Sequence, residues 1–213
     1  MRKLILLAIL MVVSATVVIS QDNSSATENS KLYIGLKAGT NYSNVYDVSG
    51  NQFAADAKFG FVGGAFLSIP IVKYLSFQPE VLFSQKGFKA SGSILGLDYT
   101  FTRTTNFIDI PLLIALKPIP AISILAGPQY SYLLKQTDVF TNAILSSTQE
   151  QEFNNNNIRK NILCFLGGID FNYQGLVLGT RVGWDIQNNN GDGTSSNPQY
   201  KNVWYQVTLG FRF

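Results

Sequence analysis

The sequence predicts an all-β protein, an eight-stranded antiparallel up-and-down transmembrane β-barrel that follows an N-terminal signal peptide. Three observations support this fold class. Apolar and polar residues alternate along many segments, which is the period of a β-strand. The connections between these segments are alternately short and long, as in barrels of the bacterial outer membrane. Charged residues make up 14% of the chain, against about 25% in soluble proteins, and no segment after residue 20 is apolar for the roughly 18 residues of a helical span.

The first 20 residues have the features of an export signal. A positive start, Arg2-Lys3, precedes the apolar run Leu4–Ile19, and Ser20 ends a small-residue cleavage site. The run is shorter than the roughly 20 residues of a membrane anchor, which favours cleavage. The expected organisation is a signal peptide over residues 1–20, a short polar periplasmic lead-in over 21–30 and the barrel over 31–213.

Eight segments alternate with a period of two. In chain order they are Lys31–Asn41, Lys58–Ile69, Tyr74–Gly87, Tyr99–Lys117, Ile122–Leu133, Arg159–Phe171, Leu176–Ile186 and Val203–Phe213. The apolar rows of the first four are Leu32, Ile34, Leu36 and Ala38; Phe59, Phe61, Gly63, Ala65, Leu67 and Ile69; Leu75, Phe77, Val81 and Phe83; and Ile108, Ile110, Leu112, Ile114 and Leu116. We expect these rows to face lipid.

The other four segments differ in how cleanly they alternate. The fifth is irregular, with Gly127, Gln129 and Ser131 as its inward set. The sixth is ambiguous in phase, and we place Asp170 inward because a lipid-facing carboxylate is costly. The seventh and eighth alternate well, with outward rows of Leu178, Val182, Trp184 and Ile186, and of Val203, Tyr205, Val207, Leu209, Phe211 and Phe213.

The connections divide by length. Three are tight turns with Pro or Gly: Pro70–Lys73, Pro118–Ala121 and Asn172–Gly175. Four are expected to be long polar loops: Tyr42–Ala57, Phe88–Asp98, Leu134–Ile158 and Gln187–Tyr200. In outer-membrane barrels the short turns are periplasmic and the long loops extracellular.

The face opposite the apolar rows carries charge, which distinguishes this barrel from a soluble one of the lipocalin kind. Buried ions cost several kcal/mol unless they are paired, so they would not line a lipocalin pocket. Inside a narrow membrane barrel they can pair with one another and fill the lumen; the alternative is a selectivity or proton path. The expected lumen charge network is Lys37, Glu80, Lys86, Asp109, Asp170, Arg181, Asp185 and Arg212.

The last segment is expected to close the barrel by pairing with Lys31–Asn41. Phe211 and Phe213 end its outward row, and an aromatic strand of this kind is the expected signal for the barrel assembly machinery. Seven further aromatic residues are expected to form girdles at the two membrane interfaces, in preference to a ligand surface, although Trp204 lies on the face of its segment opposite Val203 and Tyr205. They are Tyr42, Tyr46, Tyr130, Tyr132, Trp184, Trp204 and Tyr205.

The composition argues against several function classes. The sequence has no histidine, the usual general base, so we expect no catalytic residues and no enzyme activity. Without residues 1–20 it has 14 basic and 13 acidic residues, which gives no basis for nucleic-acid binding. Gly191-Asp192-Gly193 is only a weak match to a calcium loop, so no metal or cofactor is expected. Cys164 is the single cysteine, so no intramolecular disulfide is possible.

Three stretches carry a family resemblance. Leu75–Gly87 resembles the "l-x-P-E-l-x-y-s-x-K-G" strand of the PorT-like outer-membrane β-barrel family, and it is the most specific of the three. Asn106–Leu113 is similar to that family's "Y-h-E-I-P-L-L" strand, with Phe107 for Tyr and Asp109 for Glu, and Ala126–Leu133 to its "G-P-x-x-s-y-L" segment. The resemblance implies an eight-stranded outer-membrane barrel. The founding members of the family serve protein secretion to the cell surface.

The sequence therefore predicts an outer-membrane protein of a Gram-negative bacterium, without enzyme activity, whose long loops contact envelope or surface partners. An accessory component of a secretion or transport system is the second hypothesis, and a narrow pore or small-ligand transporter is the third. Expected partners are outer-membrane lipid, the assembly machinery during biogenesis, and envelope or secretion-system proteins through the loops. We expect a monomer.

Overall fold

The computed structural model describes residues 31–47, 55–94, 97–142, 146–151, 159–189 and 200–213. The predicted signal peptide, the lead-in and the Gly191–Gly193 loop lie outside these residues. In the described part, no helix is long and apolar enough to cross a membrane.

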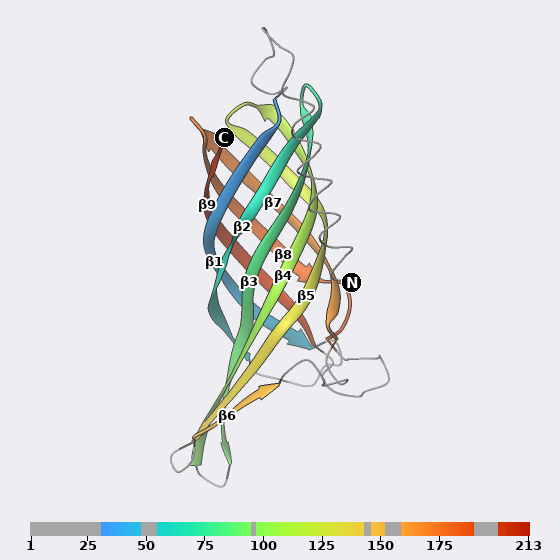
Figure 1. The fold of residues 1–213 in the computed structure, drawn as a ribbon. Helices are drawn as coiled ribbons and strands as arrows, with labels where there is room; N and C mark the ends of the chain where they lie inside the picture. Colours follow the sequence, from blue (N-terminus) through green and yellow to red (C-terminus); the bar gives the residue numbers. More distant parts are fainter. Residues whose placement is uncertain (1–30, 48–54, 95–96, 143–145, 152–158, 190–199) are drawn as a thin grey trace.

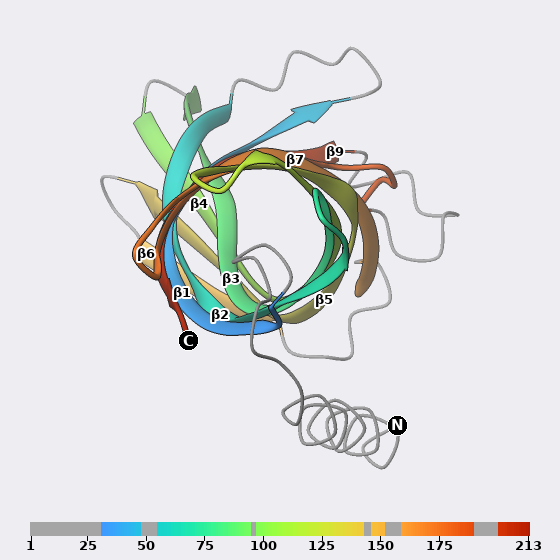
Figure 2. The same cartoon turned by 90° about the horizontal axis from the view of Figure 1, so that it is seen from above.

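Eight antiparallel strands form a ring (Figures 1 and 2), which confirms the predicted fold class. The strands of the ring are β1 (Tyr33–Asp47), β2 (Ala55–Val72), β3 (Leu75–Ile94), β4 (Leu97–Ile119), β5 (Ile122–Asn142), β7 (Asn161–Tyr173), β8 (Leu176–Asp185) and β9 (Tyr200–Arg212). Each strand of the ring pairs with the strands before and after it, so that β5 pairs with both β4 and β7. A short strand, β6 (Ser146–Gln151), pairs with the far end of β5.

The ring closes between β1 and β9, as predicted. Their register runs from Gly35 opposite Arg212 to Asp47 opposite Tyr200. Beyond the last ladder pair, the Phe213 N–H donates to the Ile34 carbonyl at 2.8 Å. Closure removes the free sheet edge, which could not satisfy its backbone groups in lipid.

The predicted short turn between β7 and β8 has the geometry of a two-residue hairpin. Gln174 and Gly175 both have positive φ, at 44° and 88°. Hairpin turns with positive φ at both central residues match the twist of the strands, and glycine adopts this conformation without strain. The turn explains why β7 and β8 pair without a loop.

The outer surface of the ring is an apolar belt. We use this name for the exposed large apolar side chains of the eight strands, among them Leu36, Phe61, Val81, Leu112, Ile114, Leu116, Ile124, Ile169, Leu178, Val207, Leu209 and Phe211. Aromatic residues lie at both of its borders. At the short-turn end these are Tyr74, Tyr173 and Phe213, and at the other end Tyr42, Phe59, Tyr130, Trp184 and Tyr205. A belt with two aromatic borders is typical of a transmembrane barrel.

Trp204 is an exception to the predicted girdles. Its side chain is fully buried inside the ring, so the girdle role predicted for it is wrong. The burial follows from the phase of β9, because Trp204 alternates with the outward residues Val203 and Tyr205. Tyr205, its neighbour in the chain, is exposed as the girdle requires.

All four predicted loops contain strand residues. In Tyr42–Ala57, β1 continues to Asp47 and β2 begins at Ala55, and Gln187–Tyr200 ends on the first residue of β9. Phe88–Asp98 lies mostly in the hairpin of β3 and β4, and the first part of Leu134–Ile158 continues β5 and then forms β6. In Figure 1 these strands project beyond the ring, at the end away from the C-terminus. We call this part the extension; it comprises Gln85–Ile94 of β3, Leu97–Asn106 of β4, Lys135–Asn142 of β5 and β6.

The extension begins where the outward row becomes polar. The last outward-facing belt residues before the extension are Phe83, Ile108 and Tyr132. The next outward residues on β3 and β4 are Gln85 and Asn106, and the Gln85 amide donates to Asn106 at 3.1 Å. Ten residues of β3 lie in the extension, which corresponds to about 30 Å along the strand. A strand this long with a polar outer face stands in water, beyond the lipid.

A β-bulge explains why the sequence pattern was interrupted here. Asn106 pairs with Lys135 but Phe107 pairs with Leu133, so Leu134 is the extra residue. On β5 the buried positions change from odd numbers, such as Ser131 and Leu133, to even numbers, such as Gln136. A pattern of period two is lost at such a shift, although the strand continues.

Removal of Phe213 is expected to impair assembly of the barrel in the membrane, because its backbone N–H bonds β1 and its ring extends the lipid-facing row of β9. The measurement is the yield of heat-modifiable protein in outer-membrane fractions, compared between wild type, the Phe213 deletion and Phe213→Tyr. The tyrosine variant keeps the ring and the backbone bond and should assemble. Equal yields for wild type and the deletion would contradict this role.

Candidate functional site

Four charged side chains form one cluster in the lumen, near the short-turn end. The Lys37 ammonium contacts the Glu80 carboxylate. Arg181 binds Asp170 through two bonds, from Nη1 to Oδ1 at 2.5 Å and from Nη2 to Oδ2 at 2.9 Å, and lies 3.8 Å from Glu80. Gln78 donates to Glu80 at 2.9 Å. All five side chains are buried, so two positive and two negative charges compensate one another inside the ring.

A second ion pair lies further along β3. The Lys86 Nζ is 3.0 Å from Oδ2 of Asp109, and both side chains are 1% exposed. The same ammonium lies 3.7 Å from the ring centre of Trp204 and 4.9 Å from that of Phe107. The two rings supply cation–π attraction where water is excluded, which accounts for the inward placement of Trp204.

Asp185 is held by neutral donors. Its Oδ2 accepts from the Asn202 backbone N–H at 2.9 Å and from the side-chain amide of Asn189 at 2.9 Å. Its Oδ1 accepts from the thiol of Cys164 at 3.2 Å. These donors satisfy both carboxylate oxygens without a directly paired cation.

An uncharged layer separates the two charge clusters. On β3, Ser84 lies between Glu80 and Lys86, and it accepts a bond from Asn41 at 3.0 Å. Gln206, the β9 residue directly opposite Asn41 in the β1–β9 ladder, donates to Asn41 at 3.0 Å. Beside these polar groups lies a buried apolar cluster, which comprises Phe107, Leu113, Ala115, Leu125, Leu133, Ile162, Cys164, Leu166 and Trp204. The lumen is therefore packed with polar and apolar side chains together.

Arg212 lies apart from these clusters, at the short-turn mouth. Its guanidinium is 4.6 Å from the ring centre of Tyr33, and its Nη1 donates to Oδ1 of Asn172 at 3.5 Å. Lys117 is at the same end and donates to Ser68 at 3.0 Å. Of the eight residues in the expected charge network, the structure thus brings seven into the interior and places Arg212 at its entrance.

Sequence reasoning missed a polar cluster in the extension. The Arg103 guanidinium donates from Nε and Nη2 to the two carboxylate oxygens of Asp138, both at 2.7 Å. Its Nη1 donates to the hydroxyl of Tyr200 at 3.0 Å. Gln136 donates to Asp138 at 3.0 Å. The signal that could have found this cluster is the alternation of β4 and β5 beyond the belt, which continues with a polar outer face.

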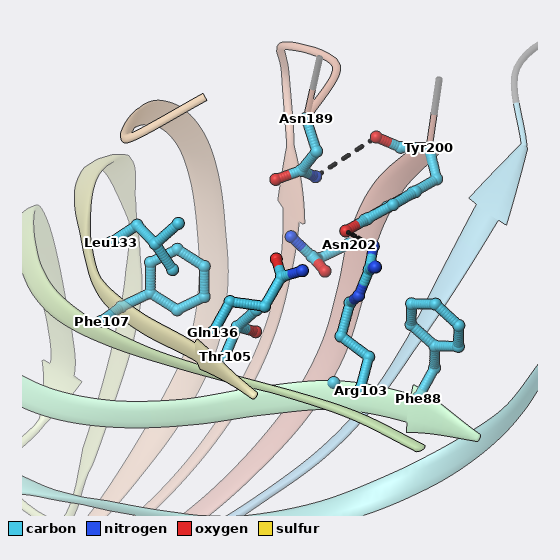
Figure 3. A pocket seen from close by; sticks show the side chains of 10 residues that line it. Phe88, Arg103, Thr105, Phe107, Leu133, Gln136, Asn189, Tyr200 and Asn202 are labelled. Atoms are coloured by element: carbon cyan, nitrogen blue, oxygen red, sulfur yellow. Dashed lines mark hydrogen bonds between the residues drawn. The ribbon is translucent and has the colours of Figure 1, made fainter. Parts of the chain in front are cut away.

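This cluster lines a recess at the loop end of the barrel, which we call the loop-end pocket (Figure 3). Its lining residues are Gly87, Phe88, Arg103, Thr105, Phe107, Leu133, Gln136, Asn189, Tyr200 and Asn202. Side chains fill this recess so closely that it has no room for a water molecule. The recess borders directly on the packed lumen, because Phe107 lines it and also lies against the Lys86 ammonium of the lumen. Among the described residues, no group of His, Cys, Asp and Glu could hold a metal ion.

Comparison with known proteins identifies a family. The family model described as "Outer membrane protein beta-barrel domain" matches residues 19–211. No curated protein matches the sequence.

Several solved outer-membrane proteins are similar in fold. Ail, the attachment invasion locus protein of Yersinia pestis, is 13% identical, with 85% of this chain and 98% of that chain covered and a TM-score of 0.45. Neisserial surface protein A is 12% identical, with coverages of 85% and 97% and a TM-score of 0.45. The outer membrane protease OmpT of Escherichia coli is 9% identical, with coverages of 90% and 99% and a TM-score of 0.39.

Replacing one partner of the Lys86–Asp109 pair is expected to destabilise the barrel more than replacing both partners. Asp109→Leu leaves a buried ammonium without its counter-ion, which costs about 3–5 kcal/mol, whereas replacing both partners by apolar residues is often close to neutral. The free energy of unfolding in lipid vesicles, measured by urea titration, should therefore fall in Asp109→Leu and recover in Lys86→Met/Asp109→Leu. If the double variant is as unstable as the single one, the charges do not act as a compensating pair.

Proposed function

Because this chain belongs to the outer membrane protein β-barrel domain family, we propose that it is a non-enzymatic surface protein of the bacterial outer membrane. Its role is to present the extension to partners outside the cell. The barrel serves as the anchor and has no transport role. The chain acts as a monomer whose partners are outer-membrane lipid, the assembly machinery during biogenesis, and surface or envelope molecules that contact the extension.

The extension is the observation that carries this proposal. β3, β4 and β5 continue far past the apolar belt, with the first residues of β2 paired to β3 at Phe88–Ala90. The outer face changes from apolar to polar at Gln85 and Asn106. The ladder between β3 and β4 is regular to the last pair, Ile94 with Leu97. The barrel does not need this part of the sheet to cross the membrane. A role in contacts with molecules outside the membrane explains it best.

The packed lumen argues against transport. Side chains that point into the ring would be exposed to water in an open channel. Here they are at most 2% exposed, as for Lys86, Trp204, Leu113 and Glu80. An eight-stranded barrel has an interior just wide enough for side chains. A continuous water path would have to displace the ion pairs, at the cost of uncompensated charges.

The absence of histidine from the sequence supports a non-enzymatic role. The buried carboxylates have structural partners: Glu80 contacts Lys37, Asp170 binds Arg181, and Asp109 contacts Lys86. A general acid or base must reach its substrate, and these groups are enclosed by the ring.

An accessory role in protein secretion is the second candidate, and it rests on the PorT-like resemblance. The residues that carry the most specific motif, Glu80 and Lys86, lie in the lumen pairs. The motif is therefore accounted for by barrel packing. A secretome that is unchanged after deletion of the gene would remove this candidate.

Surface labelling tests the proposed role. Ser91→Cys in the extension should react with a membrane-impermeant maleimide on intact cells. Lys73→Cys, in the turn between β2 and β3, should react only after the outer membrane is permeabilised. Wild type is the matched control, because its single cysteine, Cys164, is fully buried. A Ser91→Cys variant that is protected on intact cells would contradict the proposal.

No steady conductance is expected in planar bilayers, because side chains fill the lumen. The measurement is single-channel recording of purified protein, with Lys37→Ala/Glu80→Ala as a comparison that removes one ion pair from the packed interior. A stable open state of the wild-type protein would favour the narrow-pore hypothesis over the anchor role.

A further inference from the structure

Two lysines meet on the outer surface of the barrel, where the extension begins. Lys89 alternates on β3 with buried neighbours, so its exposed side chain lies on the outward face. Lys58 lies on the neighbouring strand β2, at the register shift between Ala57 and Val62, and is half-buried. It precedes the belt residues of β2 and so lies outside the membrane-spanning part of that strand. Partial burial and the positive charge of Lys89 both lower the pKa of Lys58, so the two ammonium groups are close enough to repel each other.

Neither lysine has a counter-ion in the part of the chain that the structure describes. Asp56 stands opposite Lys89 in the β2–β3 ladder, but among those residues no ion pair joins it to Lys89 or to Lys58. Lys37 and Lys86 in the lumen differ, because each contacts a carboxylate. An anion placed between the two outer lysines would offset their mutual repulsion.

The lysine pair lies at the depth of the lipid head groups. Phe59, the outermost belt residue of β2, packs against Tyr42 with 4.8 Å between ring centres, and Lys58 adjoins it on the loop side. Asp56, the ladder partner of Lys89, is three residues from Phe59. This is about 10 Å along the strand, or about 8 Å in height at a tilt of about 40°. The head-group layer on each side of the hydrocarbon is about 5–8 Å deep, so both ammonium groups can reach it.

The belt below the lysine pair offers an apolar surface to acyl chains. Phe61 on β2 and Phe83 on β3 are exposed, with 6.5 Å between ring centres. The Phe61 ring lies against Gly63, where a side chain would collide with it. Val81, the next outward residue on β3, is also exposed. A lipid bound here would place its charged group at the lysines and its chains on these side chains.

We propose that Lys58 and Lys89 bind the anionic phosphate of an outer-leaflet lipid whose acyl chains lie on the belt at Phe61 and Phe83. This inference rests on the proposed surface role for the orientation of the barrel, and it deepens that role by assigning a site to one lipid. Lysine binds phosphate as a point charge, and one phosphate group has oxygens for both ammonium groups. A soluble polyanion fits less well, because two lysines form a small patch and long-range attraction needs a larger field of one sign.

Retention of lipid by the full-length protein tests the proposal. Nanodiscs contain phosphatidylcholine, whose phosphate is neutralised by its own choline, together with either bisphosphorylated lipid A or the same lipid A after phosphatase treatment. Native mass spectrometry then counts the lipids that stay on the released protein. Wild type should retain the phosphorylated form about twentyfold better, if each lysine contributes about fivefold. Equal retention of the two forms would overturn the proposal.

Lys58→Gln and Lys89→Gln should each weaken retention of the phosphorylated form about fivefold, the effect expected of one basic residue near an anionic lipid surface. Lys89→Arg keeps the charge and should retain the lipid as wild type does. These side chains are at the surface, so heat-modifiable migration should show a folded barrel in every variant. Normal retention by Lys58→Gln/Lys89→Gln would refute the assignment of these residues.

Lys201→Gln is the matched control. Lys201 also lies on the loop side of the belt, on β9 opposite Tyr46, and β1 and β2 separate it from Lys89. Its replacement should leave retention unchanged. An equal loss in Lys201→Gln would mean that the lipid responds only to general surface charge, and displacement of lipid A by inorganic phosphate or dextran sulfate would assign the lysines to a soluble anion. Either result would overturn the proposed lipid site.

The two proposals fail in distinguishable ways. If Ser91→Cys is labelled on intact cells but retention depends neither on the phosphate nor on the two lysines, the surface role stands and the lipid inference is wrong. If Ser91→Cys is protected on intact cells, the surface role itself fails, whichever lipid is retained.

Discussion

The whole architecture depends on the requirement that every backbone N–H and C=O group in the membrane has a partner within the protein. The β1–β9 ladder satisfies it by closing the ring, with the Phe213–Ile34 bond as its last member. Closure with eight strands in turn fixes a narrow interior. The inward residues of all eight strands must then pack against one another, and the outward residues must face lipid.

The narrow interior explains the chemistry of the lumen. Charged side chains that point inward have no access to bulk water, so each needs a counter-charge or several donors. Arg181 connects Asp170 with Glu80, and Lys86 is held by one carboxylate and two aromatic rings. The pairs join β3 to β1, β4 and β8, and β8 to β7, which suits a structural role better than a path for ions.

The sequence was sufficient to predict the ring, the closing pair of strands and the inward set of charges, because each follows from a period of two. Partners within that set could not be predicted, since register and ring curvature decide which charges meet. The extension was missed for two physical reasons. The bulge at Leu134 shifts the phase of β5, and the outer row changes from apolar to polar at Gln85, which resembles loop composition. Trp204 shows the opposite case: its phase was correct, but its residue type suggested an interface.

The extension has a mechanical consequence. It shares continuous strands with the barrel, and the β3–β4 ladder crosses the membrane border without interruption, while the bulge on β5 sets a fixed bend. The ring and the extension therefore move as one rigid body. Because lipid holds the belt at a fixed height, a molecule that binds the extension would be held at a set distance and angle from the cell surface. A pull on that molecule would load backbone hydrogen bonds in shear along several strands at once, and such an arrangement resists force better than a contact on a mobile loop.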